Sequence, residues 1–214
     1  MKKFVRYGIG VGYAVYRLLR SKTTYSFRDK VVLITGGSRG LGLVLARAFV
    51  AEGAKVALMA RDHAELERAE ADLKARGGDV LIITGDVRER ASAEAAVNQT
   101  INHFGQLDVL INDAGVIQAG PLDNMDVADF TDALAVHLYG PLYTMLAARP
   151  HMRQRGEGRI VNIASIGAKI AVPHLVPYCT SKFALAGLSD GMRAELAQDN
   201  ITITTVFPGL MRTG

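Results

Sequence analysis

The sequence predicts an α/β protein built on a doubly wound parallel sheet in a single domain. Apolar runs rich in β-branched residues alternate with segments of helical periodicity along most of the chain, which is the pattern of strand–helix–strand units. The runs are apolar throughout, as in strands that are buried on both faces of a parallel sheet. The length of 214 residues suits one domain and fits two poorly.

The elements follow in order along the chain. Six apolar runs are predicted as strands, over residues 30–35, 54–60, 79–85, 107–112, 159–165 and 201–207. Segments between them carry apolar groups at helical spacing and are predicted as helices, over residues 41–52, 63–76, 89–104, 126–149 and 178–199. Gly77 and Gly78 are the expected C-terminal stop of the second helix.

The composition excludes several other classes of protein. Hydrophobic residues make up 49% of the chain and charged residues 21%, which is close to an ordinary globular protein. This rules out a disordered chain, a collagen-like chain and a disulfide scaffold. Cys179 stands alone, so no intramolecular disulfide can form, which fits a reducing compartment and a cytoplasmic protein. The five histidines show no paired metal-ligand spacing, and we expect no metal site.

The net charge of +4 is unevenly distributed. Residues 1–28 contain seven basic groups and no acid, whereas residues 29–214 carry 18 basic and 21 acidic groups, which argues against a nucleic-acid partner. Residues 7–19 are mostly apolar but too few for a spanning helix, which needs about 20. Two interpretations of residues 1–28 stay open: a segment that associates with an anionic membrane surface, and an arm that packs on the body or on a partner subunit.

The first predicted strand leads directly into a glycine-rich turn, and a helix follows. Glycines in this position permit a tight turn, let backbone N–H groups approach a pyrophosphate, and allow the helix to pack closely on the strand. The arrangement predicts a Rossmann-type dinucleotide-binding turn, with an ordinary glycine-rich turn as the plainer alternative. The residues of this turn expected to contact a cofactor are Gly36, Ser38, Arg39, Gly40, Leu41 and Gly42.

The end of the second predicted strand indicates which dinucleotide is bound. A carboxylate there would accept from the ribose 2′-OH and repel a 2′-phosphate, but the sequence reads Ala60-Arg61. Arg39 projects from the glycine turn nearby, and two guanidinium groups suit a phosphate dianion. We therefore favour NADP(H) over NAD(H), with two solvated arginines as the alternative. Asp62 is interpreted as the cap of the following helix.

A second group of polar residues follows the fifth predicted strand, at the edge where open α/β sheets bind ligands. Ser165 ends that strand, and Tyr178 and Lys182 are four residues apart on one face of the next helix. A nearby ammonium and the nicotinamide cation of an oxidised cofactor stabilise a phenolate, so that Tyr178 can exchange a proton with a carbonyl oxygen. The Ser165 hydroxyl can hold the same oxygen as negative charge develops. A tyrosine and a lysine at this spacing are usually a surface pair, but together with Ser165 and the glycine turn they indicate catalysis.

These motifs together resemble the classical short-chain dehydrogenase/reductase family. The matching segments are TGGSRGLG (35–42), Asp86-Val87, NDAG (112–115), Ser165, YCTSK (178–182), Pro208-Gly209 and Thr213. They occur in the family's order and spacing from about residue 29 to the last residue. The resemblance implies a doubly wound Rossmann fold that binds a dinucleotide cofactor and assembles as a homodimer or homotetramer through two long helices, here 126–149 and 178–199.

The resemblance also implies further cofactor contacts. Asp86 and Val87 would lie at the adenine, Asn112, Ala114 and Gly115 along the cofactor, and Pro208, Gly209 and Thr213 near the nicotinamide. Tyr178 and Lys182 are expected to contact the cofactor as well.

Three features depart from the family pattern. Asp113 replaces the second asparagine of the usual NNAG, which is a small change. His137 stands where an asparagine usually helps to organise a water and proton path behind the lysine; an imidazole can also donate and accept, or His137 can be a packed helix histidine. The sequence as given stops at Gly214, where family members continue through a substrate-covering segment and a seventh strand. We therefore expect a fold that is C-terminally truncated relative to the family, with the sixth strand at the sheet edge.

We predict an NADP(H)-dependent oxidoreductase that interconverts a carbonyl and a secondary alcohol by hydride transfer. Tyr178 serves as acid and base, Lys182 tunes it, and Ser165 holds the substrate oxygen. The mostly apolar loop over residues 166–177 indicates an apolar or acyl-type small-molecule substrate. The alternative is a cofactor-binding, catalytically weak sensor or scaffold of the same fold, which His137 and the missing C-terminal segment motivate.

A hydrolase is rejected. Residues 187–191 match the G-x-S-x-G pattern, but helix rather than strand is predicted before that serine, and no histidine follows His174.

Overall fold

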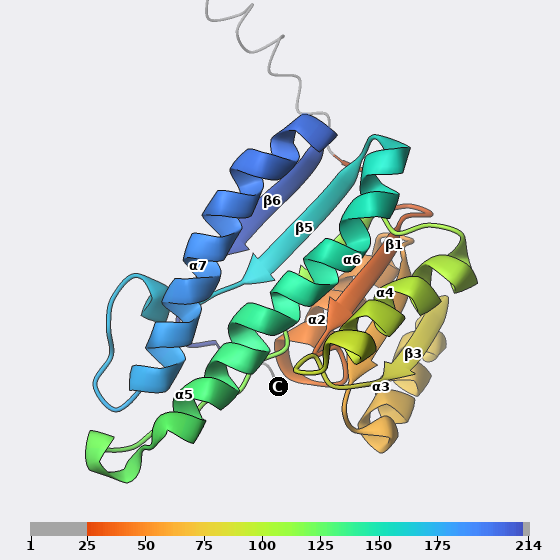
Figure 1. Cartoon of the computed structure of the whole chain (residues 1–214). Helices are drawn as coiled ribbons and strands as arrows, with labels where there is room; N and C mark the ends of the chain where they lie inside the picture. Colours follow the sequence, from red (N-terminus) through yellow and green to blue (C-terminus); the bar gives the residue numbers. More distant parts are fainter. Residues whose placement is uncertain (1–24, 212–214) are drawn as a thin grey trace, which may run out of the picture.

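The structure of the chain, a computed structural model, describes residues 25–211 (Figure 1). Most of the basic N-terminal segment, residues 1–24, lies outside the described residues, and so do residues 212–214, which include Thr213. The expectations for a membrane contact or a packing arm, and for Thr213 near the nicotinamide, concern these parts of the chain.

A parallel sheet of six strands, in the order β3-β2-β1-β4-β5-β6, forms the centre of the fold. Every neighbouring pair is parallel, which confirms the predicted doubly wound sheet. Within the described residues β6 lies at one edge, as expected. The strands are β1 Val31–Thr35, β2 Lys55–Ala60, β3 Val80–Thr84, β4 Val109–Asn112, β5 Gly158–Ile163 and β6 Ile201–Val206.

Helices cover both faces of the sheet (Figure 1). Because successive side chains of a strand point to opposite faces, β1 supplies two cores: Val31 and Leu33 pack with α4, α6 and α7, whereas Val32 and Ile34 pack with α2 and α3. Side chains buried on both faces explain why the strands are apolar throughout. The helices are α2 Gly40–Ala51, α3 His63–Ala75, α4 Arg90–Phe104, α5 Val127–Leu134, α6 Gly140–Arg155 and α7 Val176–Leu196, with short 3₁₀ turns at Leu122–Asn124, Ile166–Ala168 and Ala197–Asp199.

The helix predicted over residues 126–149 differs from the observed one. It is interrupted by a π-helical segment, Ala135–Tyr139, between α5 and α6, and such segments are frequent at functional sites. The helix then continues through Pro150 to Arg155. Pro150 is exposed and so is Leu146, whose carbonyl loses its helical donor and can bond water instead. Gly156, at φ 70°, ends the helix.

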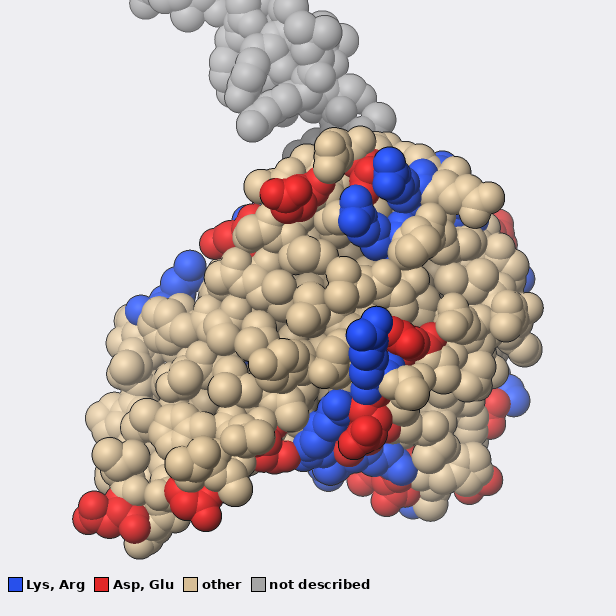
Figure 2. Space-filling view, in the orientation of Figure 1, with Lys and Arg blue, Asp and Glu red and all other residues tan. Residues whose placement is uncertain are grey.

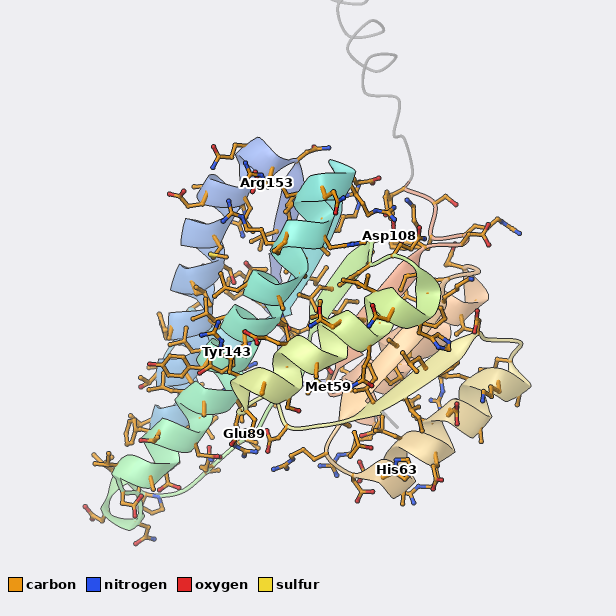
Figure 3. All side chains as sticks on the ribbon, turned by 45° about the vertical axis from the view of Figure 1, so that its right-hand side comes forward. Met59, His63, Glu89, Asp108, Tyr143 and Arg153 are labelled. Carbon is orange, nitrogen blue, oxygen red and sulfur yellow. The ribbon has the colours of Figure 1, made fainter. Side chains whose placement is uncertain are left out.

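The end of the sheet at which its parallel strands begin and the end at which they finish face different surroundings. Asp108 comes just before β4, where the strands begin, and His63 follows β2, where they end; Figure 3 shows them at opposite ends of the molecule. In Figure 2 the middle of the face formed by α6 and α7 shows few charged side chains, whereas basic and acidic side chains gather at its upper end. Within residues 25–211, no helix combines the length and the apolar composition that crossing a membrane requires.

Candidate active site

A cleft of about 630 Å³ lies at the carboxyl end of the sheet, where β1, β2, β3 and β4 finish. This volume falls in the usual range for small-molecule and cofactor sites, about 300–1,000 Å³. Ten of the residues expected to hold a dinucleotide line the cleft: Gly36, Ser38, Arg39, Gly40, Leu41, Arg61, Asp86, Val87, Ala114 and Gly115.

The glycine turn shapes the floor of this cleft. Gly36 has φ 74°, a conformation that favours glycine, and a Cβ added to it would lie 2.9 Å from the Ala114 backbone nitrogen. A Cβ on Gly42 would collide with the Gly36 carbonyl, so this glycine serves close packing and does not line the cleft. Arg39 stands at the N-cap of α2 and makes no side-chain cap hydrogen bond there. The first N–H groups of α2 at Gly40 and Leu41 therefore suit an anionic group.

Charged side chains surround the part of the cleft beside α3 and the ends of β2 and β3, which we call the outer end of the cleft. The side chains of Arg39 and Arg61 are 78% and 60% exposed, and each approaches one carboxylate: Arg39 Nη1 lies 3.7 Å from Glu65 Oε1, and Arg61 Nη1 lies 4.0 Å from Asp86 Oδ2. Asp62 caps α3 as predicted, since its Oδ1 accepts from the Glu65 N–H at 2.9 Å. Both guanidinium groups remain able to reach an anion from solvent.

Sequence reasoning missed Arg88, which also lines the cleft. Its Nη1 donates to Asp86 Oδ2 at 2.9 Å and its Nε donates to Asp132 Oδ1 at 2.7 Å. Asp132 in turn accepts from Gln118 Nε2 at 3.0 Å. This chain of contacts ties the loop after β3 to α5 and to the loop after β4. Because Arg88 is only two residues after Asp86, the sequence could have indicated its place in the cleft. Its pairing with Asp132 on α5 could not be predicted from the sequence.

The three predicted catalytic residues lie near one another beyond the carboxyl end of β5. They are Ser165, Tyr178 and Lys182. Ser165 follows the end of that strand by two residues, is buried, and accepts from the Gly167 N–H at 3.0 Å. A Cβ on Gly167 would lie 3.3 Å from Tyr178 Cε1 and 3.4 Å from Ser165 Oγ. The serine hydroxyl and the phenol ring therefore both lie next to Gly167. Lys182 Nζ donates to the Ile163 carbonyl at 2.8 Å and lies 5.8 Å from the centre of the Tyr178 ring.

Two buried charged groups define the electrostatics of this region. Burial lowers the pKa of Lys182 to about 8, and the nearby charge of Asp113 opposes that shift. Burial raises the pKa of Asp113 to about 7, while Lys182 and the Gly42 N–H favour its ionised form. Asp113 lines the cleft, so an acid and an ammonium share this part of the site without a direct ion pair among the described residues.

His137 is packed inside the π-helical segment. Its Nε2 accepts from the Val116 N–H at 3.1 Å. Ser181 Oγ donates to the Tyr178 carbonyl at 2.8 Å and lies 2.7 Å from His137 Nδ1, so Nδ1 carries the proton and donates to the serine oxygen. Burial lowers the pKa of His137 to about 2. Both ring nitrogens are occupied and the ring is neutral, which matches the packed-histidine interpretation and leaves no free nitrogen for a proton path.

Other expected cofactor residues lie away from the cleft wall. Asn112 is buried: its Nδ2 donates to Asn162 Oδ1 at 2.8 Å, and its Oδ1 accepts from Thr144 Oγ1 at 2.7 Å. The side chain therefore joins β4 to β5 and α6 and does not line the cleft, and the expected place of Asn112 along a cofactor stays a prediction. The Pro208 carbonyl accepts from the Ile166 N–H at 2.9 Å, beside the loop that carries Ser165. Gly209 follows it there; neither residue is among those that line the cleft.

Comparisons with known proteins agree with this architecture. Residues 30–214 match the family model described as short chain dehydrogenase. A "Dehydrogenase/reductase SDR family protein 7-like" from Anopheles gambiae is 38% identical, over 86% of this chain and 60% of its own length. The D-threitol dehydrogenase of Mycolicibacterium smegmatis is 34% identical, over 88% of this chain and 74% of its own.

A solved structure of NAD+-bound xylitol dehydrogenase superposes with a TM-score of 0.84 at 31% identity, covering 89% of this chain and 74% of that one. Against the mosquito relative, the chain spans only 60% of the relative's length. The family match, the six-stranded parallel sheet and the glycine turn agree, and the chain belongs to the short-chain dehydrogenase/reductase family of oxidoreductases.

Proposed function

We propose that the protein is an NADP(H)-dependent oxidoreductase that interconverts a carbonyl and a secondary alcohol, with Ser165, Tyr178 and Lys182 as its catalytic residues. The observation that carries the proposal is that the Ser165 hydroxyl and the Tyr178 ring both lie next to Gly167, with the Lys182 ammonium 5.8 Å from the centre of that ring. The names of two similar proteins, D-threitol dehydrogenase and NAD+-bound xylitol dehydrogenase, support the oxidoreductase part of the proposal. When bound, the nicotinamide supplies or takes up the hydride.

The roles of the three residues follow from their surroundings. Tyr178 Oη exchanges a proton with the substrate oxygen. The Lys182 ammonium is fixed by the Ile163 carbonyl and stabilises negative charge on that phenol oxygen. Ser165 Oγ uses its acceptor capacity for the Gly167 N–H, so its own hydroxyl proton remains for the substrate oxygen.

The preference for NADP(H) rests on the outer end of the cleft. Arg39 and Arg61 both line it and both have largely exposed guanidinium groups. A 2′-phosphate dianion can draw both toward itself, because Arg–phosphate pairs are stronger than hydrogen bonds between neutral groups. An Arg61→Asp variant should lose the preference for the phosphorylated cofactor, and a retained preference would show that this interpretation of the ribose site is wrong.

The proposed substrate is apolar or acyl-type. Ile166, Ile170 and Val172 are 44%, 64% and 40% exposed in the loop that follows Ser165. An apolar wall next to the hydroxyl that would hold the substrate oxygen favours a ligand with a hydrocarbon portion.

The proposed assembly is a homodimer or homotetramer through α5, α6 and α7. Tyr139, Leu146 and Phe183 are each more than two-fifths exposed, and Figure 2 shows few charges on this face. An exposed apolar face of this kind favours association.

The test of the proposal is the Tyr178→Phe variant of the full chain, assayed for reduction of a panel of apolar ketones. Loss of the hydroxyl should lower turnover by about 10²–10⁴-fold and leave NADPH binding unchanged. Undiminished turnover would contradict the role of Tyr178. A wild-type protein that binds NADPH but reduces nothing, and whose biological role survives this substitution, would favour the sensor or scaffold alternative.

A further inference from the structure

One acidic side chain lies beside Arg39, one of the two arginines proposed to bind the phosphate. Glu65, in the first turn of α3, lines the cleft, and its Oε1 lies 3.7 Å from Arg39 Nη1. Its other oxygen, Oε2, accepts from Ser38 Oγ at 2.9 Å. A carboxylate that contacts a guanidinium and a glycine-turn hydroxyl makes the contacts that a 2′-phosphate would require.

The other two acids at this end of the cleft are differently engaged. Asp62 accepts from the Glu65 N–H and so caps α3. Asp86 accepts from the Arg88 guanidinium at 2.9 Å. The shortest contact of the Glu65 carboxylate is instead the hydrogen bond that it accepts from the neutral hydroxyl of Ser38. The Glu65 side chain is only 24% exposed. It is therefore the acid in this group that contacts both Arg39 and a hydroxyl of the glycine turn.

Ser38 makes the arrangement specific. It is buried, 8% exposed, and its hydroxyl has a single proton to donate, which goes to Glu65. A phosphate that binds to the glycine turn and Arg39 must take over this donor or forgo it. If the phosphate takes over this donor, the Glu65 carboxylate has to move away, since two anions within hydrogen-bonding distance of one hydroxyl repel each other.

We propose that Glu65 is a specificity-determining residue that occupies the adenosine 2′-phosphate subsite and weakens the discrimination that Arg39 and Arg61 provide. The proposal rests on the proposed NADP(H) function. The carboxylate acts as a substitute anion for the arginine and for Ser38 when no 2′-phosphate is bound. When the phosphate binds, Glu65 gives up both contacts. Helix α3 is unaffected, because its cap uses the backbone N–H of Glu65 and not the carboxylate.

The experiment compares Glu65→Gln with wild type in calorimetric titrations of two ligands, adenosine 2′,5′-bisphosphate and 5′-AMP. Both ligands probe the adenosine end alone. Glutamine keeps an oxygen that can accept from Ser38 and removes the charge. The variant should bind the bisphosphate about five- to tenfold more tightly, the size of one like-charge contact in a partly exposed site, and should bind 5′-AMP within about twofold of wild type.

The matched control is Glu67→Gln, which makes the same chemical change two residues along α3. The Glu67 side chain is 63% exposed, pairs with His63 at 3.5 Å, and does not line the cleft. It should change the affinity for neither ligand. Equal gains in the two variants would reveal a general effect of net charge and would overturn the proposal.

An unchanged or weaker affinity of Glu65→Gln for the bisphosphate would also overturn it. Failure of the proposed cofactor preference has a different signature: the wild-type protein would then bind the bisphosphate no more tightly than 5′-AMP. A gain in Glu65→Gln would support the role of Glu65 whichever ligand the wild type prefers.

Discussion

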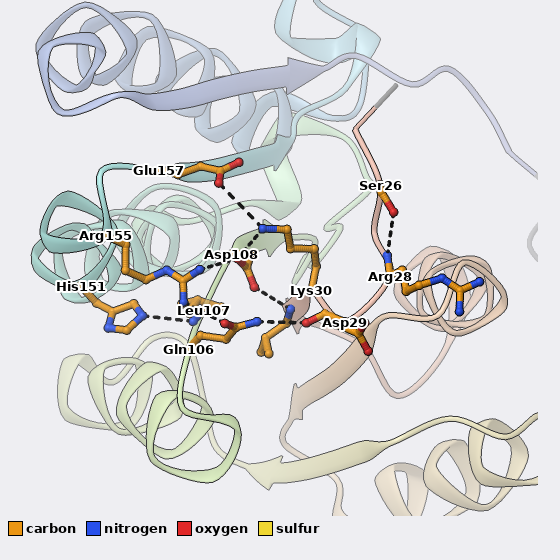
Figure 4. Close-up of polar contacts among 11 residues, drawn as sticks. Ser26, Arg28, Asp29, Lys30, Gln106, Leu107, Asp108, His151, Arg155 and Glu157 are labelled. Atoms are coloured by element: carbon orange, nitrogen blue, oxygen red, sulfur yellow. Dashed lines mark hydrogen bonds and ion pairs between the residues drawn. The ribbon is translucent and has the colours of Figure 1, made fainter. Parts of the chain in front are cut away.

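The two ends of the parallel sheet, where the strands begin and where they finish, both contain buried charges. The two ends use these charges differently. At the end where the strands begin, the Asp108 side chain is 2% exposed and accepts from the Val31 N–H at 2.8 Å, from Lys30 Nζ at 3.2 Å and from Arg155 Nη2 at 3.0 Å (Figure 4). Two cations and a backbone donor thus compensate for the loss of water around this carboxylate. The same figure shows Leu107 donating its N–H to His151 Nε2, at 3.2 Å.

At the end where the strands finish, two charged groups, Lys182 and Asp113, form no ion pair among the described residues. Lys182 bonds to a neutral carbonyl, and Asp113 is bonded to the Gly42 N–H. Their pKa values move toward neutrality, to about 8 and about 7. The comparison teaches that buried charge alone does not mark a functional site. A completed ion-pair network stabilises the fold, whereas incompletely compensated groups beside a cleft remain able to bind ligands and move protons.

The largest effect on stability is expected at Asp108. An Asp108→Ala variant leaves Lys30 and Arg155 without their shared carboxylate and should lower the free energy of unfolding by about 3 kcal/mol, as for other broken buried pairs. Urea denaturation measures this loss. The control is Asp79→Ala, whose carboxylate is exposed and 3.6 Å from Lys55; it should cost less than about 1 kcal/mol. Similar losses in the two variants would contradict the structural role assigned to Asp108.

The opposite result is expected at Lys182. A Lys182→Met variant replaces a buried ammonium by an apolar chain of similar length, so thermal unfolding should occur at the same or a higher temperature. Turnover should fall by at least about 100-fold because the phenolate of Tyr178 loses its neighbouring charge. A large loss of stability would mean that Lys182 belongs to the structural charges, and the contrast between the two ends would then fail.

His137 should make stability depend on pH. Its pKa in the fold is about 2 against an ordinary 6.5, so the unfolded chain binds a proton that the folded chain refuses. Stability from this residue is fully present above pH 6.5 and decreases as the pH falls toward 2. Between pH 7.5 and 5, wild type should lose about 2 kcal/mol more than a His137→Asn variant. Parallel losses in the two proteins would contradict the neutral, packed state of this ring.

The smallest effect is expected from Asp113→Asn, which restores the residue usual in the family. The Asp113 carboxylate favours the ammonium form of Lys182, so its removal should lower the pKa of Lys182 further below 8. The alkaline limb of the pH–turnover profile should then move to lower pH. An unmoved limb would show that Asp113 does not act on Lys182.

Local signals made much of the fold predictable. The strands that carry the site end in the glycine turn and in the segment of Ser165, and their continuous apolar character was enough to assign a parallel sheet. Asp62 could be assigned as a cap because it directly precedes a helical pattern. Tyr178 and Lys182 could be paired because four residues make one helical turn.

Features that depend on tertiary contacts were not predictable. Asn112 turns into the core because Asn162 on β5 and Thr144 on α6 offer hydrogen bonds, and neither is near it in sequence. Glu65 lies in the cleft because Ser38, 27 residues earlier, faces it. The π-helical segment leaves the apolar periodicity of the helix almost unchanged, so the sequence pattern does not reveal it.

The central claim is that Arg39 and Arg61, which line the cleft at the carboxyl end of the sheet, favour a phosphorylated dinucleotide. The most direct measurement is a pair of fluorescence titrations of the protein, one with NADPH and one with NADH, at the same ionic strength. The account predicts binding of both, with NADPH at least about tenfold tighter, the size expected of a charge-assisted phosphate contact. Equal or tighter binding of NADH would contradict it.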